Sequence, residues 1–222
     1  MAYIVNNLIK GVFIKEAKTR FLCEVKVNNE IVLCYVPISC KLSNLIELKE
    51  NEVLLSLNNK NAKTKYTLFA IKHNKTYIMV NTGIANRLIY NYYLENKPEI
   101  ELKSECFVEN YKCDFYNEED NLIIEVKSII SMNTIITLPN MNTQRAVEQL
   151  KKIKHLIRKG YKIEYYFLVL SEKPTNIFIE RKSVYGKLLY ECMKKGMNII
   201  CFHTSVIGNQ LYLSKEQGIT FV

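Results

Sequence analysis

The sequence of 222 residues is poor in glycine and proline and lacks the motifs that identify several large enzyme classes. None of its seven glycines belongs to a Gly-rich phosphate loop, which argues against an NTPase or a Rossmann enzyme and against a nucleotide cofactor. A Gly-x-Ser-x-Gly motif, the mark of an α/β-hydrolase, is also missing. The three histidines form no His-x-x-x-His pair, so we expect turn, surface or core residues rather than metal ligands.

Features of export and membrane insertion are missing too. The first residues lack the basic start and long apolar core of a signal peptide, and no apolar run approaches the ~20 residues of a membrane-spanning helix. Seven cysteines are scattered without a Cys-x-x-Cys pair, and their odd number indicates reduced core residues rather than a zinc site or a disulfide framework. We therefore expect a soluble, cytoplasmic protein with no membrane partner.

The composition is that of a globular protein with an excess of positive charge. The hydrophobic fraction is 48% and the charged fraction 24%, and the length suits one large domain or two small ones. The net charge of +9 favours an acidic partner such as nucleic acid. A bias toward Lys, Asn and Ile codons would produce part of the same charge without any function.

Residues 1–82 are predicted to form an OB-like β-barrel. They contain about six short runs rich in β-branched and aromatic residues, over 8–14, 20–27, 30–36, 52–57, 66–71 and 76–80. Basic residues, among them Arg20 and Lys65, fall in or beside the expected loops. They could contact nucleic acid, or they could be ordinary solvated side chains.

Residues 83–222 are predicted to form an α/β domain with a mixed sheet. Helical periodicity over 84–95, 144–159 and 185–195 alternates with apolar strand-like runs, and Gly160 and Gly196 are placed to end the second and third helices. The helix over 144–159 carries a basic surface that includes Lys151. Such a surface could lie along phosphates, although a solvated outer face is the commoner explanation.

Charged residues concentrate in and beside the apolar strand over 122–129. Glu125 and Lys127 are two residues apart and therefore share one face of that strand. If the polar stretch 117–121 forms a hairpin turn, Asp114 lies opposite Glu125 on the same face. Two carboxylates and an ammonium in apolar surroundings suit a Mg²⁺ or Mn²⁺ site. A cross-strand ion pair is the alternative.

These features together resemble the sugar fermentation stimulation protein family, over essentially the whole chain. The resemblance rests on the order and spacing of Gly11-Val-Phe-Ile14, Arg20-Phe-Leu22, Lys65-Tyr-Thr-Leu68, Val80-Asn-Thr82, Asn86-Arg-Leu88, Lys112-Cys-Asp-Phe115, Glu125-Val-Lys-Ser128, Leu138-Pro139, Thr143-x-Arg145 and Leu150. It implies an N-terminal OB-like barrel joined to a PD-(D/E)xK nuclease-like domain. It also implies DNA binding and metal-dependent cleavage of DNA or RNA, together with a link to the regulation of sugar metabolism.

The sequence departs from the family pattern at several positions. In residues 37–42, Ile38 and Cys40 replace the usual asparagine and glycine. Asn140 replaces an aspartate, and Gln149 replaces a histidine. The residues expected to hold metal are intact, so these departures bear on the grip and choice of substrate.

The first hypothesis is a Mg²⁺- or Mn²⁺-dependent phosphodiesterase. Asp114, Glu125 and the Val126 carbonyl are expected to bind metal, and Lys127 to orient water or steady the transition state. Gln149 is expected to position water or the nucleic-acid backbone.

The second hypothesis is a non-catalytic DNA-binding regulator with a vestigial nuclease site. The changes at Ile38, Cys40 and Asn140 favour it slightly, whereas the intact acidic pair and lysine disfavour it. Both hypotheses have a nucleic-acid partner, for which the expected contacts are Arg20, Lys65, Arg87, Arg145 and Lys151.

Overall fold

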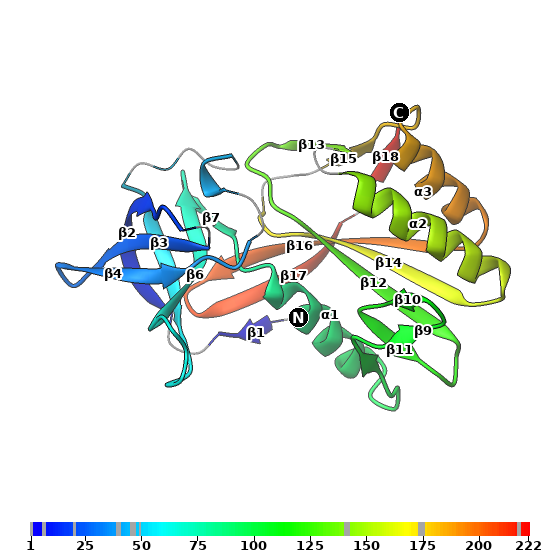
Figure 1. Cartoon of the computed structure of the whole chain (residues 1–222), viewed down its shortest axis with the longest axis horizontal. Helices are drawn as coiled ribbons and strands as arrows, with labels where there is room; N and C mark the ends of the chain where they lie inside the picture. The colour runs from blue at the N-terminus through cyan, green and yellow to red at the C-terminus, as the bar shows by residue number, and fades with distance from the viewer. Residues whose placement is uncertain are drawn as a thin grey trace.

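The chain folds into a β-barrel and an α/β domain that lie next to each other along the long axis of the molecule (Figure 1). The computed structural model describes residues 2–5, 8–19, 21–38, 41–44, 48, 50–139, 143–172, 176–216 and 219–222. Arg20, Cys40 and Asn140, which the sequence singled out, lie outside the described residues.

The barrel is built from six short antiparallel strands and one parallel pairing. The strands are β2 (Ile9–Glu16), β3 (Leu22–Val27), β4 (Glu30–Tyr35), β5 (Glu52–Leu57), β6 (Tyr66–His73) and β7 (Thr76–Met79), with the 3-10 helix η1 (Leu42–Asn44) after β4. They are ordered β4-β3-β2-β5-β6-β7, and a parallel pairing of β4 with β6 closes the first five into a barrel. Asn28 and Asn29 both have positive φ, as a two-residue hairpin turn requires. The predicted OB-like barrel is confirmed.

The second domain contains a seven-stranded mixed sheet, also as predicted. Its order is β1 (Ala2–Ile4), β17 (Gln210–Glu216), β16 (Asn198–Ile207), β14 (Lys162–Val169), β12 (Leu122–Ile129), β11 (Phe115–Asn117) and β8 (Lys103–Ser104). The central strands β12, β14 and β16 are parallel, and the outer pairings are antiparallel. Because β1 pairs with β17, residues 2–4 lie in this sheet and not in the barrel with which the sequence grouped them.

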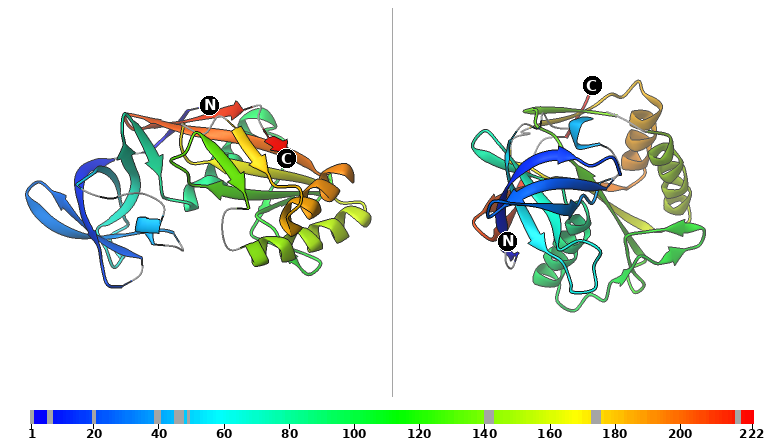
Figure 2. Two further views of the ribbon diagram at one scale, coloured as in Figure 1. Left: turned by 90° about the horizontal axis from the view of Figure 1, so that it is seen from above. Right: turned by 60° about the vertical axis from the view of Figure 1, so that its left-hand side comes forward.

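Helices cover both faces of this sheet (Figure 2). α1 (Gly83–Asn96) packs on one face, and α2 (Thr143–Arg158) and α3 (Val184–Lys194) pack side by side on the other. Gly160 and Gly196 have positive φ just beyond α2 and α3, as expected for glycines that follow a helix C-terminus. No helix within the described ranges is long and apolar enough to cross a membrane.

Smaller elements complete the α/β domain. β9 (Phe107–Val108) and β10 (Tyr111–Lys112) form a hairpin, and β13 (Ile135–Leu138), β15 (Asn176–Ile179) and β18 (Ile219–Phe221) form a separate parallel sheet. β13 does not extend the β11–β12 pair, because it pairs with β15, which lies some forty residues later in the chain.

The barrel and the α/β domain share buried contacts. Phe69 and Met79 of the barrel belong to the same apolar cluster as Ile84 and Leu88 of α1. The Met79 amide donates to the Leu170 carbonyl at 2.8 Å. Thr82 occupies the N-cap position of α1 without a side-chain cap bond, and its hydroxyl donates to the Pro37 carbonyl of the barrel at 2.9 Å.

Candidate metal-dependent active site

A polar cleft of about 490 Å³ opens where β10, the middle of β12 and the first turns of α2 meet. Glu125 and Lys127 line it from β12, and Asp114 lines it from the segment just before β11. Figure 1 shows α2 lying across the sheet beside this hairpin region. The three residues that the sequence predicted to converge therefore lie in one cleft.

The β12 strand buries Glu125 almost completely and leaves Lys127 a route to solvent. Glu125 is 3% exposed, whereas the Lys127 side chain is 25% exposed. The Lys127 ammonium donates to Glu125 Oε1, and the Tyr111 hydroxyl donates to Glu125 Oε2 at 2.5 Å. Burial raises the pKa of Glu125, with a smaller contribution from the Asp114 charge, and Lys127 opposes this shift. The ionised form of the buried Glu125 carboxylate is therefore stabilised by its neighbours Lys127 and Tyr111.

Asp114 is held at the point where the β11–β12 ladder ends. Phe115 pairs with Ile124, so Asp114 falls opposite Glu125, as the predicted hairpin required. One Asp114 carboxylate oxygen accepts the Val126 amide at 2.7 Å, and the other accepts the Asn86 side-chain amide at 2.9 Å. The first bond gives the Val126 amide a side-chain acceptor in place of a backbone carbonyl of a neighbouring strand. The second comes from α1 on the other side of the sheet.

Helix α2 contributes the far wall of the cleft. Gln149 Oε1 accepts the Lys127 ammonium at 2.8 Å, and Gln149 Nε2 lies 3.5 Å from Glu125 Oε1. Arg145 is exposed and lines the cleft one turn earlier. Lys151 does not line it and instead pairs with Glu148 at 2.8 Å. The next residue, Lys152, lines the cleft instead, because successive side chains of an α-helix are rotated by about 100° around its axis.

Two further expected nucleic-acid contacts, Arg87 and Lys65, lie outside this cleft. Arg87 lines an adjacent hollow of about 500 Å³ that shares Asp114 and Glu105 with the cleft, and its guanidinium donates to the Tyr3 hydroxyl at 3.1 Å. Lys65 directly precedes the barrel strand β6, with its ammonium 5.2 Å from the centre of the Tyr66 ring.

The donor set fits a hard divalent cation. Two carboxylates and the neighbouring Val126 backbone supply oxygen from one side of an open polar cleft, and Mg²⁺ commonly uses one or two carboxylates with water as its other ligands. No group of three His, Cys, Asp or Glu side chains suited to a metal occurs among the described residues. Water or phosphate oxygens would therefore have to complete any coordination shell here.

Two residues of the site escaped the sequence analysis. Tyr111 sits on the two-residue strand β10, too short to show periodicity, and only the folded hairpin brings its hydroxyl to Glu125. The sequence indicated the charged residue Arg87 as a site residue and not its neighbour Asn86. In the structure, the Asn86 side-chain amide donates the hydrogen bond to Asp114. Ile38, one of the departures from the family pattern, is 5% exposed and packs in the barrel core.

Comparison with known proteins matches both parts of the chain. Residues 17–80 match the family described as the SfsA N-terminal OB domain, and residues 79–210 match the sugar fermentation stimulation protein RE domain. A sugar fermentation stimulation protein homolog from Pelagibacter ubique is 30% identical over 94% of this chain and 95% of its own length. A homolog from Thermosipho melanesiensis is 28% identical over 98% and 96%.

One solved structure has the same fold. SfsA of Pyrococcus furiosus in complex with Ca²⁺ superposes with a TM-score of 0.81 at 17% identity, covering 98% of this chain and 97% of that one. The match over 79–210 spans more than half of the sequence, and the full-length relatives agree with it. The chain therefore belongs to the sugar fermentation stimulation protein (SfsA) family.

Proposed function

We propose that this protein is a Mg²⁺- or Mn²⁺-dependent nuclease that hydrolyses phosphodiester bonds in nucleic acid. The observation that carries the proposal is the juxtaposition of Asp114, Glu125 and Lys127 in one open polar cleft. Buried charges are costly unless they are paired, and an ion pair alone would not call for a second carboxylate beside it. Asp114 and Glu125 carry like charges and repel each other. A divalent cation bound by both carboxylates would offset this repulsion.

The metal would be held by Asp114, Glu125 and the Val126 carbonyl. When bound, it would lower the pKa of a water and offset charge that develops on the scissile phosphate. The structure of the Pyrococcus furiosus relative contains Ca²⁺. Ca²⁺ and Mg²⁺ both prefer oxygen ligands, so that structure supports a divalent-cation site in a protein of this fold.

The protein's own side chains have separate tasks in this scheme. Lys127, held by Glu125 and Gln149, aims an ammonium into the cleft where it can donate to the attacking water or to a phosphoryl oxygen. Arg145, exposed on the rim, can bind a neighbouring phosphate. Tyr111 fixes the orientation of the Glu125 carboxylate.

The barrel is proposed to hold the substrate. The OB architecture and the net charge of +9 both suit a polyanion, and Lys65 lies beside the exposed loop that joins β5 and β6. The described interior of the barrel is formed by apolar side chains. The C-terminal domain, proposed to begin near residue 83, therefore carries the chemistry.

The test compares Asp114→Asn with Asp120→Asn. Asp120 is a matched control, because it is an aspartate in the same hairpin, is exposed to solvent and pairs with Lys162 at 3.1 Å. Supercoiled DNA, single-stranded DNA and RNA would each be incubated with Mn²⁺, with Mg²⁺ and with EDTA. We expect metal-dependent cleavage by the wild type and by Asp120→Asn, and its loss in Asp114→Asn.

Two outcomes of this assay would contradict the proposal. Binding of nucleic acid by the wild type with no cleavage under either metal would favour the non-catalytic regulator. Cleavage by Asp114→Asn at the wild-type rate would place the chemistry elsewhere. Calorimetric titration of Mn²⁺ into both variants separates loss of the metal from loss of a later step.

A further inference from the structure

Two cysteines lie side by side at the base of the β9–β10 hairpin, next to the candidate metal site. Phe107 pairs with Lys112, so the next residues outward, Cys106 and Cys113, face each other across the hairpin. The Cys113 amide donates to the Cys106 carbonyl at 3.0 Å, and the two Sγ atoms are 3.7 Å apart. The fold therefore brings two thiols into direct contact.

The geometry of this pair fits a disulfide bond. Opposed residues in a hydrogen-bonded antiparallel pair have Cα atoms about 5.5 Å apart, which is within the range that disulfides span. The Cys113 thiol already points across the hairpin, since its Sγ atom also lies 3.4 Å from the Cys106 carbonyl oxygen. Bond formation requires the two sulfur atoms to approach each other to about 2.0 Å.

Cys106 is the member of the pair that solvent can reach. Its side chain is partly exposed. The rest of the described cysteines are buried, namely Cys23, Cys34, Cys113, Cys192 and Cys201. Cysteines that are oxidised reversibly are typically accessible and lie next to a second thiol that resolves the first product. Cys106 and Cys113 have these two properties.

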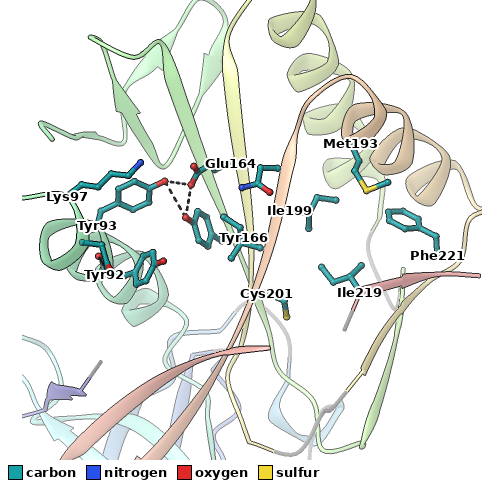
Figure 3. A pocket seen from close by; sticks show the side chains of 13 residues that line it. Tyr92, Tyr93, Lys97, Glu164, Tyr166, Met193, Ile199, Cys201, Ile219 and Phe221 are labelled. Carbon is teal, nitrogen blue, oxygen red and sulfur yellow. Dashed lines mark hydrogen bonds between the residues drawn. The ribbon is translucent and has the colours of Figure 1, made fainter. Parts of the chain in front are cut away.

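Other described cysteines lack one property or the other. Cys23 and Cys34 face each other across β3 and β4, but both are completely buried in the barrel core. Cys201 lines a second cleft, of about 660 Å³, and the described lining of that cleft includes no other cysteine (Figure 3). The contact between two thiols and the access to solvent therefore occur together at the β9–β10 hairpin.

The backbone connects this cysteine pair to Asp114. Cys113 directly precedes Asp114, and the Asp114 carbonyl accepts the amide of Glu105, the residue before Cys106, at 2.8 Å. Cys113 is 1% exposed and packs in the apolar core, where close packing leaves its side chain little room to rotate alone. Closing the gap between the two sulfur atoms will therefore shift the backbone that carries Asp114.

We propose that Cys106 and Cys113 form a redox-sensitive modification site, at which a peroxide produces a reversible disulfide that displaces the Asp114 carboxylate. The Cys106 sulfur attacks hydrogen peroxide, becomes a sulfenic acid and releases one water. The Cys113 sulfur then attacks the Cys106 sulfur, a second water leaves and the S–S bond forms. The two thiols together lose two electrons and two protons, which the peroxide takes up. Formation of the bond is independent of the nuclease proposal, whereas its effect on metal binding rests on that proposed function.

The first experiment treats the fully reduced, full-length protein with an equimolar amount of hydrogen peroxide. We expect mass spectrometry to show the loss of two hydrogen atoms, and dithiothreitol to reverse it. Peptide mapping should place the bond between Cys106 and Cys113, with the buried pair Cys23 and Cys34 still reduced as the internal control. Cys106→Ser, which keeps the size of the side chain, should show no such loss.

The second experiment measures the displacement of Asp114, first without metal and then with it. The Val126 amide donates to Asp114 at 2.7 Å, so its NMR signal in metal-free protein should shift on oxidation, whereas the amide signals of the barrel strand β5 should not. After removal of the dithiothreitol, Mn²⁺ should bind the oxidised protein at least about tenfold more weakly than the reduced protein in calorimetry.

Several results would overturn the proposal. One is a folded protein that keeps both thiols or gains oxygen at Cys106 without a bond to Cys113. Another is an unchanged Val126 signal in protein whose disulfide has been mapped. If Cys106→Ser fails to fold, peptide mapping of the wild type still decides whether the bond forms. Failure of the reduced protein to bind Mn²⁺ would contradict the proposed function instead, and the mass and NMR results would still decide on the disulfide.

Discussion

Replacing Lys127 with methionine would leave Glu125, which is 3% exposed, without the ammonium that bonds its Oε1 atom. Methionine has a similar length and leaves the apolar stem of the side chain in place. The Tyr111 hydroxyl and the Gln149 amide would remain as neutral neighbours. The perturbation therefore removes one charge and little volume.

The size of the effect follows from the burial of the pair. Removing one partner of a buried pair costs about 3–5 kcal/mol, but Lys127 is one-quarter exposed, so we expect about 1–3 kcal/mol at neutral pH. The pKa of Glu125 is already raised by burial, and loss of Lys127 raises it further. A raised folded-state pKa gives stability that is present below the unfolded value and is lost as pH rises through the folded value. The destabilisation by Lys127→Met should therefore grow with pH.

Urea unfolding in metal-free buffer at about pH 5 and about pH 8 measures this trend. Added Mn²⁺ should reduce the difference between wild type and variant, because the metal replaces the missing positive charge. Lys152→Met is the control, since Lys152 lines the same cleft but, among the described residues, its ammonium bonds the Asn110 carbonyl and no carboxylate, and the change should alter stability by less than about 0.5 kcal/mol. A Lys127→Met effect that is independent of both pH and Mn²⁺ would refute the reasoning.

Three further predictions concern the site, α3 and the barrel. Asn86→Ala should weaken Mn²⁺ binding about tenfold in calorimetry because Asp114 loses a positioning bond, whereas Arg87→Ala should leave it unchanged; equal losses would contradict this role. Gly186→Ala should lower the free energy of unfolding by about 3 kcal/mol, because its Cβ would stand 2.1 Å from the Glu180 carbonyl oxygen. Gly83→Ala, with its nearest contact at 3.4 Å, is the tolerated control in the same urea titration. Lys65→Glu should raise KM for nucleic acid and leave kcat nearly unchanged, and a fall in kcat alone would place the barrel inside the reaction.

The sequence predicted those parts of the site that depend on local pairing. The spacing of Glu125 and Lys127 and the length of the turn determined which residues face each other, and the structure has the same register. Which lysine of α2 faces the cleft could not be predicted from charge alone, because Lys151 and Lys152 are adjacent in sequence and both are basic. Contacts between distant segments, such as Asn86 with Asp114, leave no periodic signal. The parallel sheet of β13, β15 and β18 was missed for the same reason, since each of its strands is short and its neighbours are remote in sequence.

The two side-chain bonds at the start of α1 make that helix a short mechanical link. Thr82 is hydrogen-bonded to Pro37, two residues beyond the barrel strand β4, and Asn86, four residues after Thr82, is hydrogen-bonded to Asp114. Four residues of helix span about 6 Å and bend little. A ligand that shifts the barrel wall would therefore move Asn86 with it. The hydrogen bond from Asn86 would then displace the Asp114 carboxylate. By linkage, substrate on the barrel and metal in the cleft should change each other's affinity by the same factor.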